Sequence, residues 1–181
     1  MPQSTRLLVV DPDRKQVSEF GSMLAQEDCY LVAAESGTEA LELARHESFD
    51  LVICEFRLEG IGGLALIAEF QRKDPHLPVV MVTKNPGSNT AIEAIKSGAY
   101  DFLAKPVDPD ELRKVVREAV AASRRMSKQV EIGVEADSPS PDSDALIGKS
   151  REMLEIYKAL GRLSATPVTV LIRGETGTGK E

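Results

Sequence analysis

The first 127 residues predict an α/β fold, a doubly wound five-stranded parallel sheet with helices on both faces. Short, continuous apolar runs recur along this part of the chain, as expected of strands buried on both faces of a sheet. Segments in which apolar residues recur at helical spacing separate these runs. Such alternation is typical of parallel sheets with helical crossovers, and 181 residues with 42% apolar content suffice for their core.

Five strands are predicted in order, with the sequences RLLVVD (6–11), YLVAA (30–34), FDLVICE (49–55), PVVMVT (78–83) and YDFLAK (100–105). Five helices are predicted at residues 13–27, 38–47, 64–73, 89–96 and 110–127. Ser36 and Glu39 form a capping box ahead of the second helix, and Gly98 is expected to end the fourth. The fifth helix carries an apolar stripe of Leu112, Val115, Val116, Ala119 and Val120.

Charge and composition restrict the class of protein. The chain has 22 Lys and Arg residues against 29 Asp and Glu, a formal charge of -7, so it has no overall attraction to nucleic acid. No apolar run approaches the roughly 18 residues of a membrane span and no signal peptide pattern opens the chain, so we expect a cytoplasmic protein. Cys29 and Cys54 are expected to be reduced core residues, and His46 and His76 surface residues rather than metal ligands.

Polar residues stand where four of the predicted strands end. They are Asp11, Glu55, Thr83 and Lys105, the last followed by Pro106. Open α/β sheets bind ligands beyond the carboxyl ends of their strands, so these side chains are expected on one rim of the sheet. A polar residue at a strand end is also what simple exit into solvent requires, but four together favour a functional site.

These residues belong to stretches that resemble the receiver domain of bacterial two-component response regulators, a flavodoxin-like fold. The resemblance covers about residues 5–127 and is carried by LLVVDPD, DLVICEFRLEGIGGL, PVVMVT, AIKSGAYDFLAKP and DPDELRKVV. In that family, two adjacent acids after the first strand and an aspartate after the third hold Mg²⁺, and this aspartate takes a phosphoryl group from a phosphohistidine. The resemblance implies that Asp11, Thr83, Phe102 and Lys105 are switch residues and that Glu55 stands at the phosphoacceptor position.

The sequence departs from the family pattern at the positions that carry the chemistry. Pro12 replaces the second acid, and Asp13 is expected to begin a helix and point elsewhere, so no metal site and no Mg²⁺ are expected. Glu55 is one methylene longer than the usual aspartate, and Glu59 stands where the family usually has proline. We therefore expect no catalytic residue and a receiver that works without phosphorylation. The alternative is a receiver still phosphorylated by a sensor histidine kinase or a small phosphodonor.

Two readings of Glu55 stay open: its charge imitates a phosphoryl group near Thr83 and Lys105, or it is a relic that pairs with Lys105 for structural reasons alone. A phosphoryl group carries nearly two negative charges and a glutamate one, so charge does not decide between them. A flavin-binding, flavodoxin-like module is disfavoured because such a module needs a Ser-, Thr- and Gly-rich loop after the first strand, where this chain has DPDRKQ.

The remaining sequence predicts a linker at residues 128–144, rich in Ser, Pro and Asp, and the start of a second domain at residues 145–181. The strand-like run VTVLIRG leads into a phosphate-binding loop, formed by Gly174, Glu175, Thr176, Gly177, Thr178, Gly179, Lys180 and Glu181. Residues 145–181 resemble the opening of the AAA+ ATPase domain of sigma-54-dependent transcription activators, in which GTGKE is usual.

Together these resemblances suggest the N-terminal part of a regulator of the nitrogen regulatory protein C type. They imply a homodimer through the receiver's fourth helix, fifth strand and fifth helix. They also imply contacts of further domains with sigma-54 RNA polymerase and DNA, and a possible sensor histidine kinase. ATP with Mg²⁺ is expected only for the full-length protein, so the chain itself is not expected to be an enzyme.

Overall fold

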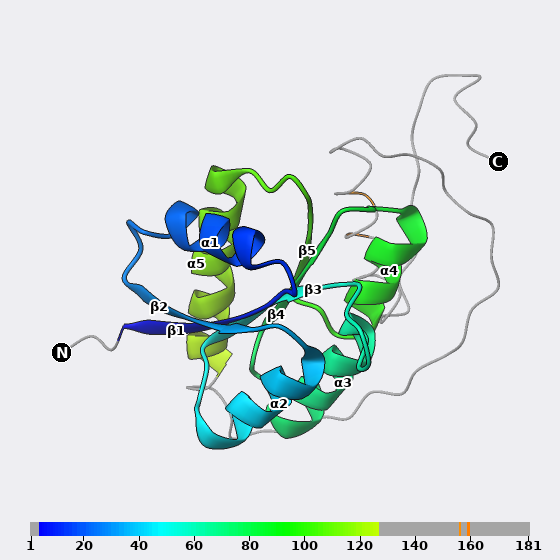
Figure 1. Cartoon of the computed structure of the whole chain (residues 1–181), viewed down its shortest axis with the longest axis horizontal. Coiled ribbons are helices and arrows are strands. Elements are labelled where there is room, and N and C mark those ends of the chain that lie inside the picture. The colour runs from blue at the N-terminus through cyan, green and yellow to red at the C-terminus, as the bar shows by residue number, and fades with distance from the viewer. Residues whose placement is uncertain (1–3, 127–155, 157–158, 160–181) are drawn as a thin grey trace.

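The computed structural model describes residues 4–126, 156 and 159. The predicted linker (128–144) and the predicted phosphate-binding loop (174–181) lie outside the described residues. Strands and helices alternate along residues 4–126 as predicted (Figure 1). The strands are β1 (Thr5–Val10), β2 (Cys29–Ala34), β3 (Leu51–Glu55), β4 (Val79–Thr83) and β5 (Asp101–Ala104). The helices are α1 (Arg14–Met23), α2 (Gly37–His46), α3 (Gly63–Lys73), α4 (Ser88–Lys96) and α5 (Pro109–Met126).

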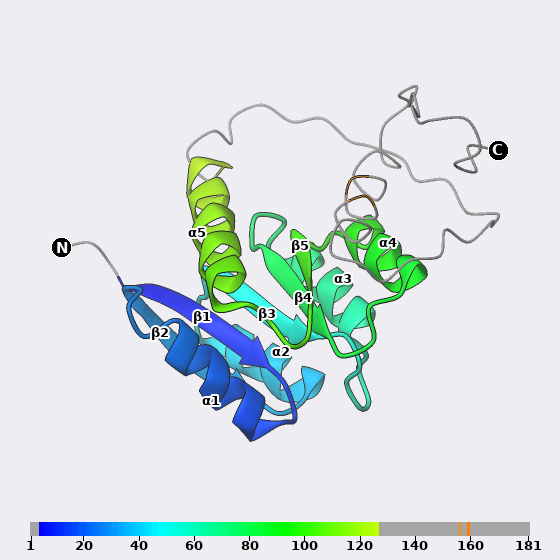
Figure 2. The same ribbon diagram turned by 90° about the horizontal axis from the view of Figure 1, so that it is seen from above.

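The five strands form one parallel sheet in the order β2-β1-β3-β4-β5. Seen from above in Figure 2, they lie side by side behind α1 and α5. The order reverses at β1, because the chain passes first to β2 on one side and then to β3 on the other. The loops after β1 and β3 therefore diverge over the carboxyl edge of the sheet, which is where ligands bind in folds of this kind.

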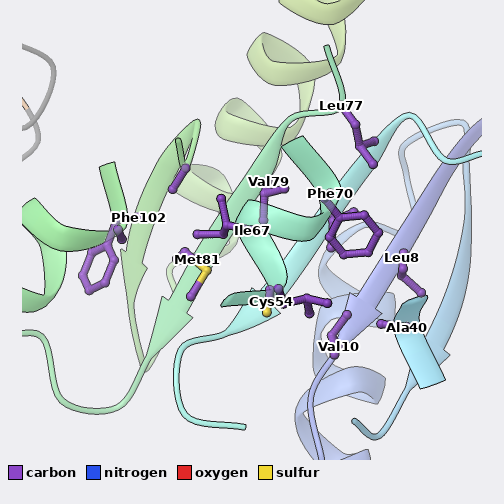
Figure 3. Packing of buried hydrophobic residues seen from close by; sticks show 14 of the residues in the cluster. Leu8, Val10, Ala40, Cys54, Ile67, Phe70, Leu77, Val79, Met81 and Phe102 are labelled. Carbon is purple, nitrogen blue, oxygen red and sulfur yellow. The ribbon is translucent and has the colours of Figure 1, made fainter. Parts of the chain in front are cut away.

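Burial on both faces explains why β1, β3 and β4 are continuous apolar runs. Successive side chains of a strand point to opposite faces, so Leu8, Val10 and Cys54 pack toward α2, α3 and α4 (Figure 3). Their neighbours Leu7 and Val9 pack on the other face, toward α1 and α5. Both faces need apolar residues, so no polar alternation is possible.

Local signals set several element ends. The Ser36 hydroxyl accepts a hydrogen bond from the Glu39 amide (3.2 Å), as the capping box predicts. The Glu39 carboxylate, however, accepts from the amide of Glu35 (2.8 Å), one residue before the cap. Gly98 follows the last turn of α4 with φ of +95°, a backbone conformation that a side chain would strain, so its predicted role is confirmed.

Three expectations need adjustment. Helix α1 ends at Met23 rather than Glu27, because residues 24–28 make turns that carry the chain back into β2. Cys54 is buried as predicted, whereas Cys29 at the start of β2 is only half-buried. His46 is exposed and His76 is half-buried.

Among the described residues, no helix has the length and apolarity needed to cross a membrane.

Candidate functional site

The carboxyl edge of the sheet holds a hollow of about 200 Å³. Asp11 follows β1, Glu55 and Thr83 end β3 and β4, and Lys105 follows β5. The parallel strands thus bring together four residues that are far apart in the sequence. The other lining residues are Pro12, Asp13, Arg57, Lys84 and Asn85.

The centre of the site is an ion triad formed by Asp11, Glu55 and Lys105. The Lys105 Nζ lies 2.5 Å from Asp11 Oδ2 and 2.6 Å from Glu55 Oε2. The three side chains are only 4%, 4% and 10% exposed for Lys105, Asp11 and Glu55. The three charges are thus nearly removed from water. In such a buried setting the attraction between opposite charges is much stronger than at the surface.

Each carboxylate of the triad uses its second oxygen on a backbone amide. Asp11 Oδ1 accepts from the amide of Asp13 at 2.9 Å. Glu55 Oε1 accepts from the amide of Arg57 at 3.2 Å. Each of the four carboxylate oxygens therefore has a donor, which offsets the cost of burying two acids.

The electrostatics keep Lys105 charged. Burial by itself lowers the pKa of the ammonium, but the hydrogen bonds to Asp11 and Glu55 and the charges of those carboxylates outweigh it. The net result is a pKa raised above the ordinary lysine value. Lys105 therefore stays an ammonium over the physiological pH range.

The remaining predicted residues have different surroundings. Thr83 is 1% exposed and lines the hollow, and its hydroxyl accepts from the Asn85 amide at 3.3 Å. Phe102 is fully buried in the core on the side of α4 and is not among the residues that line the hollow (Figure 3). The sheet thus brings Asp11, Glu55, Thr83 and Lys105 to one rim, as the strand ends predict. Phe102, which only the family resemblance singled out as a switch residue, is packed in the core.

Pro12 and Asp13 occupy the first turn after Asp11. Pro12 is exposed and offers the hollow no carboxylate. Asp13 caps α1, as predicted, by accepting from the Lys15 amide at 3.1 Å, and this hydrogen bond is the main reason that its pKa is lowered. Its other oxygen lies 3.7 Å from Lys84 Nζ, and the residue still borders the hollow. Among the described residues, no group of three or more His, Cys, Asp or Glu side chains is arranged to hold a metal ion.

Two cations at the mouth of the hollow, Arg57 and Lys84, were missed from the sequence. Each follows a predicted strand-end residue within two positions, Arg57 after Glu55 and Lys84 after Thr83. Loop residues so close to a strand end share its rim, so extending the reading two residues beyond each strand would have found both. They surround the triad with positive charge on its solvent side.

Comparison with known proteins identifies the family of the chain. The profile of the response regulator receiver domain matches residues 7–117, and that of the sigma-54 interaction domain matches residues 146–181. The transcriptional regulatory protein ZraR of Salmonella typhimurium is 34% identical over 175 residues, which are 97% of this chain and 38% of that protein. The DNA-binding transcriptional regulator NtrC of Escherichia coli K12 is 34% identical over 173 residues, 96% of this chain and 36% of that protein.

Among solved structures, the receiver domain of NtrX from Brucella abortus superposes with a TM-score of 0.60 at 33% identity, covering 64% of this chain and 98% of that one. The chain spans little more than a third of the length of the curated relatives named above. The receiver profile alone accounts for more than half of the residues. The chain therefore belongs to the response regulator receiver family, with the sequence of a sigma-54 interaction domain beginning after it.

Proposed function

We propose that this chain is the regulatory receiver of a sigma-54-dependent transcriptional regulator, and that the receiver works without phosphoryl transfer. The main support for this proposal is the ion triad. The Lys105 ammonium lies 2.5 Å from a carboxylate oxygen of Asp11 and 2.6 Å from one of Glu55, the residue at the acceptor position. Both carboxylates share a single ammonium of the protein itself, so one positive charge serves two acids. The two acids are therefore already held together by a cation that the protein supplies.

The acceptor residue is displaced for in-line chemistry. A glutamate carries its carboxylate about 1.5 Å further from the backbone than an aspartate, one C–C bond. Phosphoryl transfer depends almost entirely on positioning, and a misplacement near 1 Å can reduce the rate about 100-fold. The fixed hydrogen bonds of Glu55 to Lys105 and to the Arg57 amide leave its carboxylate little freedom to reach another position.

A divalent cation does not fit the residues as they stand. Magnesium requires near-octahedral oxygen ligands and is usually held by carboxylates. Here Asp11 and Glu55 bind an ammonium, and Pro12 stands where the family places the second acid. We accordingly propose that the receiver has no resident Mg²⁺ and that the chain by itself is not an enzyme.

The partners follow from the family and belong to the whole protein. Residues 146–181 match the sigma-54 interaction domain, so we propose an ATPase that uses the loop at 174–181 and acts on sigma-54 RNA polymerase. DNA binding would come from a further domain, and a sensor histidine kinase remains a possible partner. We further propose a cytoplasmic homodimer that pairs through α4, β5 and α5.

A second candidate is a receiver that is still phosphorylated. One observation favours it: Asp13 borders the same hollow as Asp11 and Glu55, so a third carboxylate stands at the rim although its sequence position is shifted by one. Against it, Asp13 is occupied as the cap of α1 and faces Lys84. A metal would have to displace both contacts.

Intact mass spectrometry separates the two candidates. After incubation with a small phosphodonor and Mg²⁺, the unaltered chain should keep its mass. The double variant Pro12→Asp with Glu55→Asp should gain one phosphoryl group, because Asp11, Thr83 and Lys105 are already in place. Glu55→Asp alone and Pro12→Asp alone serve as matched controls and should gain little. A phosphoryl adduct on the unaltered chain would support the second candidate and contradict the first.

A further inference from the structure

A second hollow lies far from the ion triad, between α5 and the starts of β1 and β2. It measures about 390 Å³. Its α5 wall consists of Val116, Arg117, Val120, Ala121 and Arg124. Its opposite wall consists of Thr5, Glu27, Asp28 and Cys29. We call it the α5 groove; neither the triad nor the receiver chemistry uses it.

The α5 groove has an apolar floor and charged walls. Val116 and Val120 are nearly buried, and with Ala121 and the half-buried Cys29 they form the floor. Exposed Arg117 stands on one wall, and within the described part of the chain its side chain donates to the Arg113 carbonyl at 3.3 Å but meets no carboxylate. The opposite wall carries the acids Glu27 and Asp28, so an acid of a bound segment is favoured only on the Arg117 side. The groove therefore suits a segment with apolar residues toward its floor and an acid that can lie beside Arg117.

The chain itself supplies such a segment directly after α5. Residues 129–135 read QVEIGVE, so Val130, Ile132 and Val134 alternate with Glu131, Gly133 and Glu135. A period of two places the three aliphatic side chains on one side of an extended segment and the acids on the other. Apolar residues at this spacing are unexpected in a stretch that continues as ADSPSPDSD.

Length and connectivity agree with docking in the same molecule. Helix α5 ends at Met126, two residues beyond Arg124 at the edge of the groove. Three residues then remain before Val130, enough to reverse the chain. The wall from Val116 to Arg124 is about 12 Å long at 1.5 Å per residue. Residues 130–134 span about 13 Å when extended, at 3.3 Å per residue.

The last turn of α5 provides a fixed starting point for this reversal. Ser123 donates to the His76 carbonyl at 2.9 Å, and Arg124 donates to the Thr5 hydroxyl at 3.2 Å. Arg124 also lies 3.6 Å from Asp50. We infer that residues 130–134 lie in the α5 groove of their own chain, with the three aliphatic side chains on its floor and an acid beside Arg117.

Cys29 reports on this inference because it lines the groove and is only half-buried, whereas Cys54 is buried in the core. Burial, Glu27 and Asp28 raise the pKa of Cys29, which slows its alkylation to a rate that is convenient to follow at mildly alkaline pH. Alkylation of the full 181-residue chain by a neutral maleimide is followed by intact mass. Cys54 should stay unlabelled, which shows that the protein remains folded.

The test variant replaces Val130, Ile132 and Val134 with Ser in the full chain. Cys29 should then react at least about twofold faster, because the reagent reaches the thiol only when the groove is open. The control Ser138→Ala with Ser140→Ala, beyond the segment, should keep the original rate. A change below twofold in the test variant would overturn the inference.

Oxidation gives a second, independent measurement. In the Ile132→Cys variant, mild oxidation should form a disulfide with Cys29 within a monomer, whereas Ser138→Cys should not form one. Protection of Cys29 that grows with protein concentration, together with a disulfide-linked dimer, would show that a second copy fills the groove and would overturn docking within one chain.

Discussion

Replacing Lys105 with Met should lower the free energy of unfolding by about 3–5 kcal/mol at pH 7, the range found when one partner of a buried ion pair is removed. Methionine keeps an unbranched chain of similar length, so packing changes little and the lost charge dominates. Asp11 and Glu55 then remain buried, at 3% and 8% exposure, without their cation.

The geometry supports that magnitude. Asp11 Oδ2 and Glu55 Oε2 lie 2.5 Å and 2.6 Å from one nitrogen. They are therefore at most about 5 Å apart, and two like charges at that distance repel by roughly 3 kcal/mol at an effective dielectric constant of 20. The hydrogen bonds of each acid to the ammonium are lost as well, while those to backbone amides remain.

Urea unfolding followed by far-ultraviolet circular dichroism measures this loss, since the chain has no tryptophan for fluorescence. The matched control is Lys84→Met at the mouth of the same hollow. Lys84 is 66% exposed and 3.7 Å from Asp13, so its removal should cost less than about 1 kcal/mol. If the unfolding free energies of the two variants differ by less than about 1 kcal/mol, the triad does not stabilise the fold as argued.

The contribution of Lys105 to stability should depend on pH in a definite direction. Because the folded-state pKa of Lys105 is raised, its contribution is complete below the unfolded value of about 10.4 and is lost as pH rises through the higher folded value. The difference in unfolding free energy between the unaltered chain and Lys105→Met should therefore stay constant from pH 7 to 9.

A further prediction concerns the loop beside Glu55. A Cβ on Gly63 would lie 2.7 Å from Met81 Cε and 2.8 Å from the Glu55 carbonyl oxygen. Gly63→Ala should therefore lower the unfolding free energy by about 1–3 kcal/mol in the same urea experiment. The control Gly62→Ala, which has open space around it, should leave the unfolding free energy nearly unchanged.

The central strands of the receiver could be predicted because their apolar runs are buried on both faces of the sheet. β3 and β4 are buried at every residue, and nothing but a doubly covered strand needs such a run. The end of α1 could not be placed, because residues 24–27 have helix-compatible side chains and the turn is imposed by the return into β2. That constraint is tertiary and leaves no local pattern.

The sequence predicted which residues form the site but not which of them contact one another. Strand ends identify the rim, and Asp11, Glu55 and Lys105 each follow or end a strand. That one ammonium serves both acids depends on the reach of Lys105 across three strand ends, which spacing along the chain does not encode. Phe102 followed only from the family resemblance, because no spacing along the chain assigns it a role, and it packs in the core on the side of α4.

The shared lysine also makes the question of mimicry testable. In Glu55→Gln, Lys105 keeps Asp11 as its partner, so the loss of stability should be well below that of Lys105→Met, and the fold should survive. Any change in self-association then reports signalling rather than unfolding. If Glu55 imitates a phosphoryl group, sedimentation at tens of micromolar should show that the unaltered chain forms dimers and that Glu55→Gln shifts the dimer equilibrium. An unchanged equilibrium would favour the relic interpretation, and a strictly monomeric unaltered chain would contradict pairing through α4, β5 and α5.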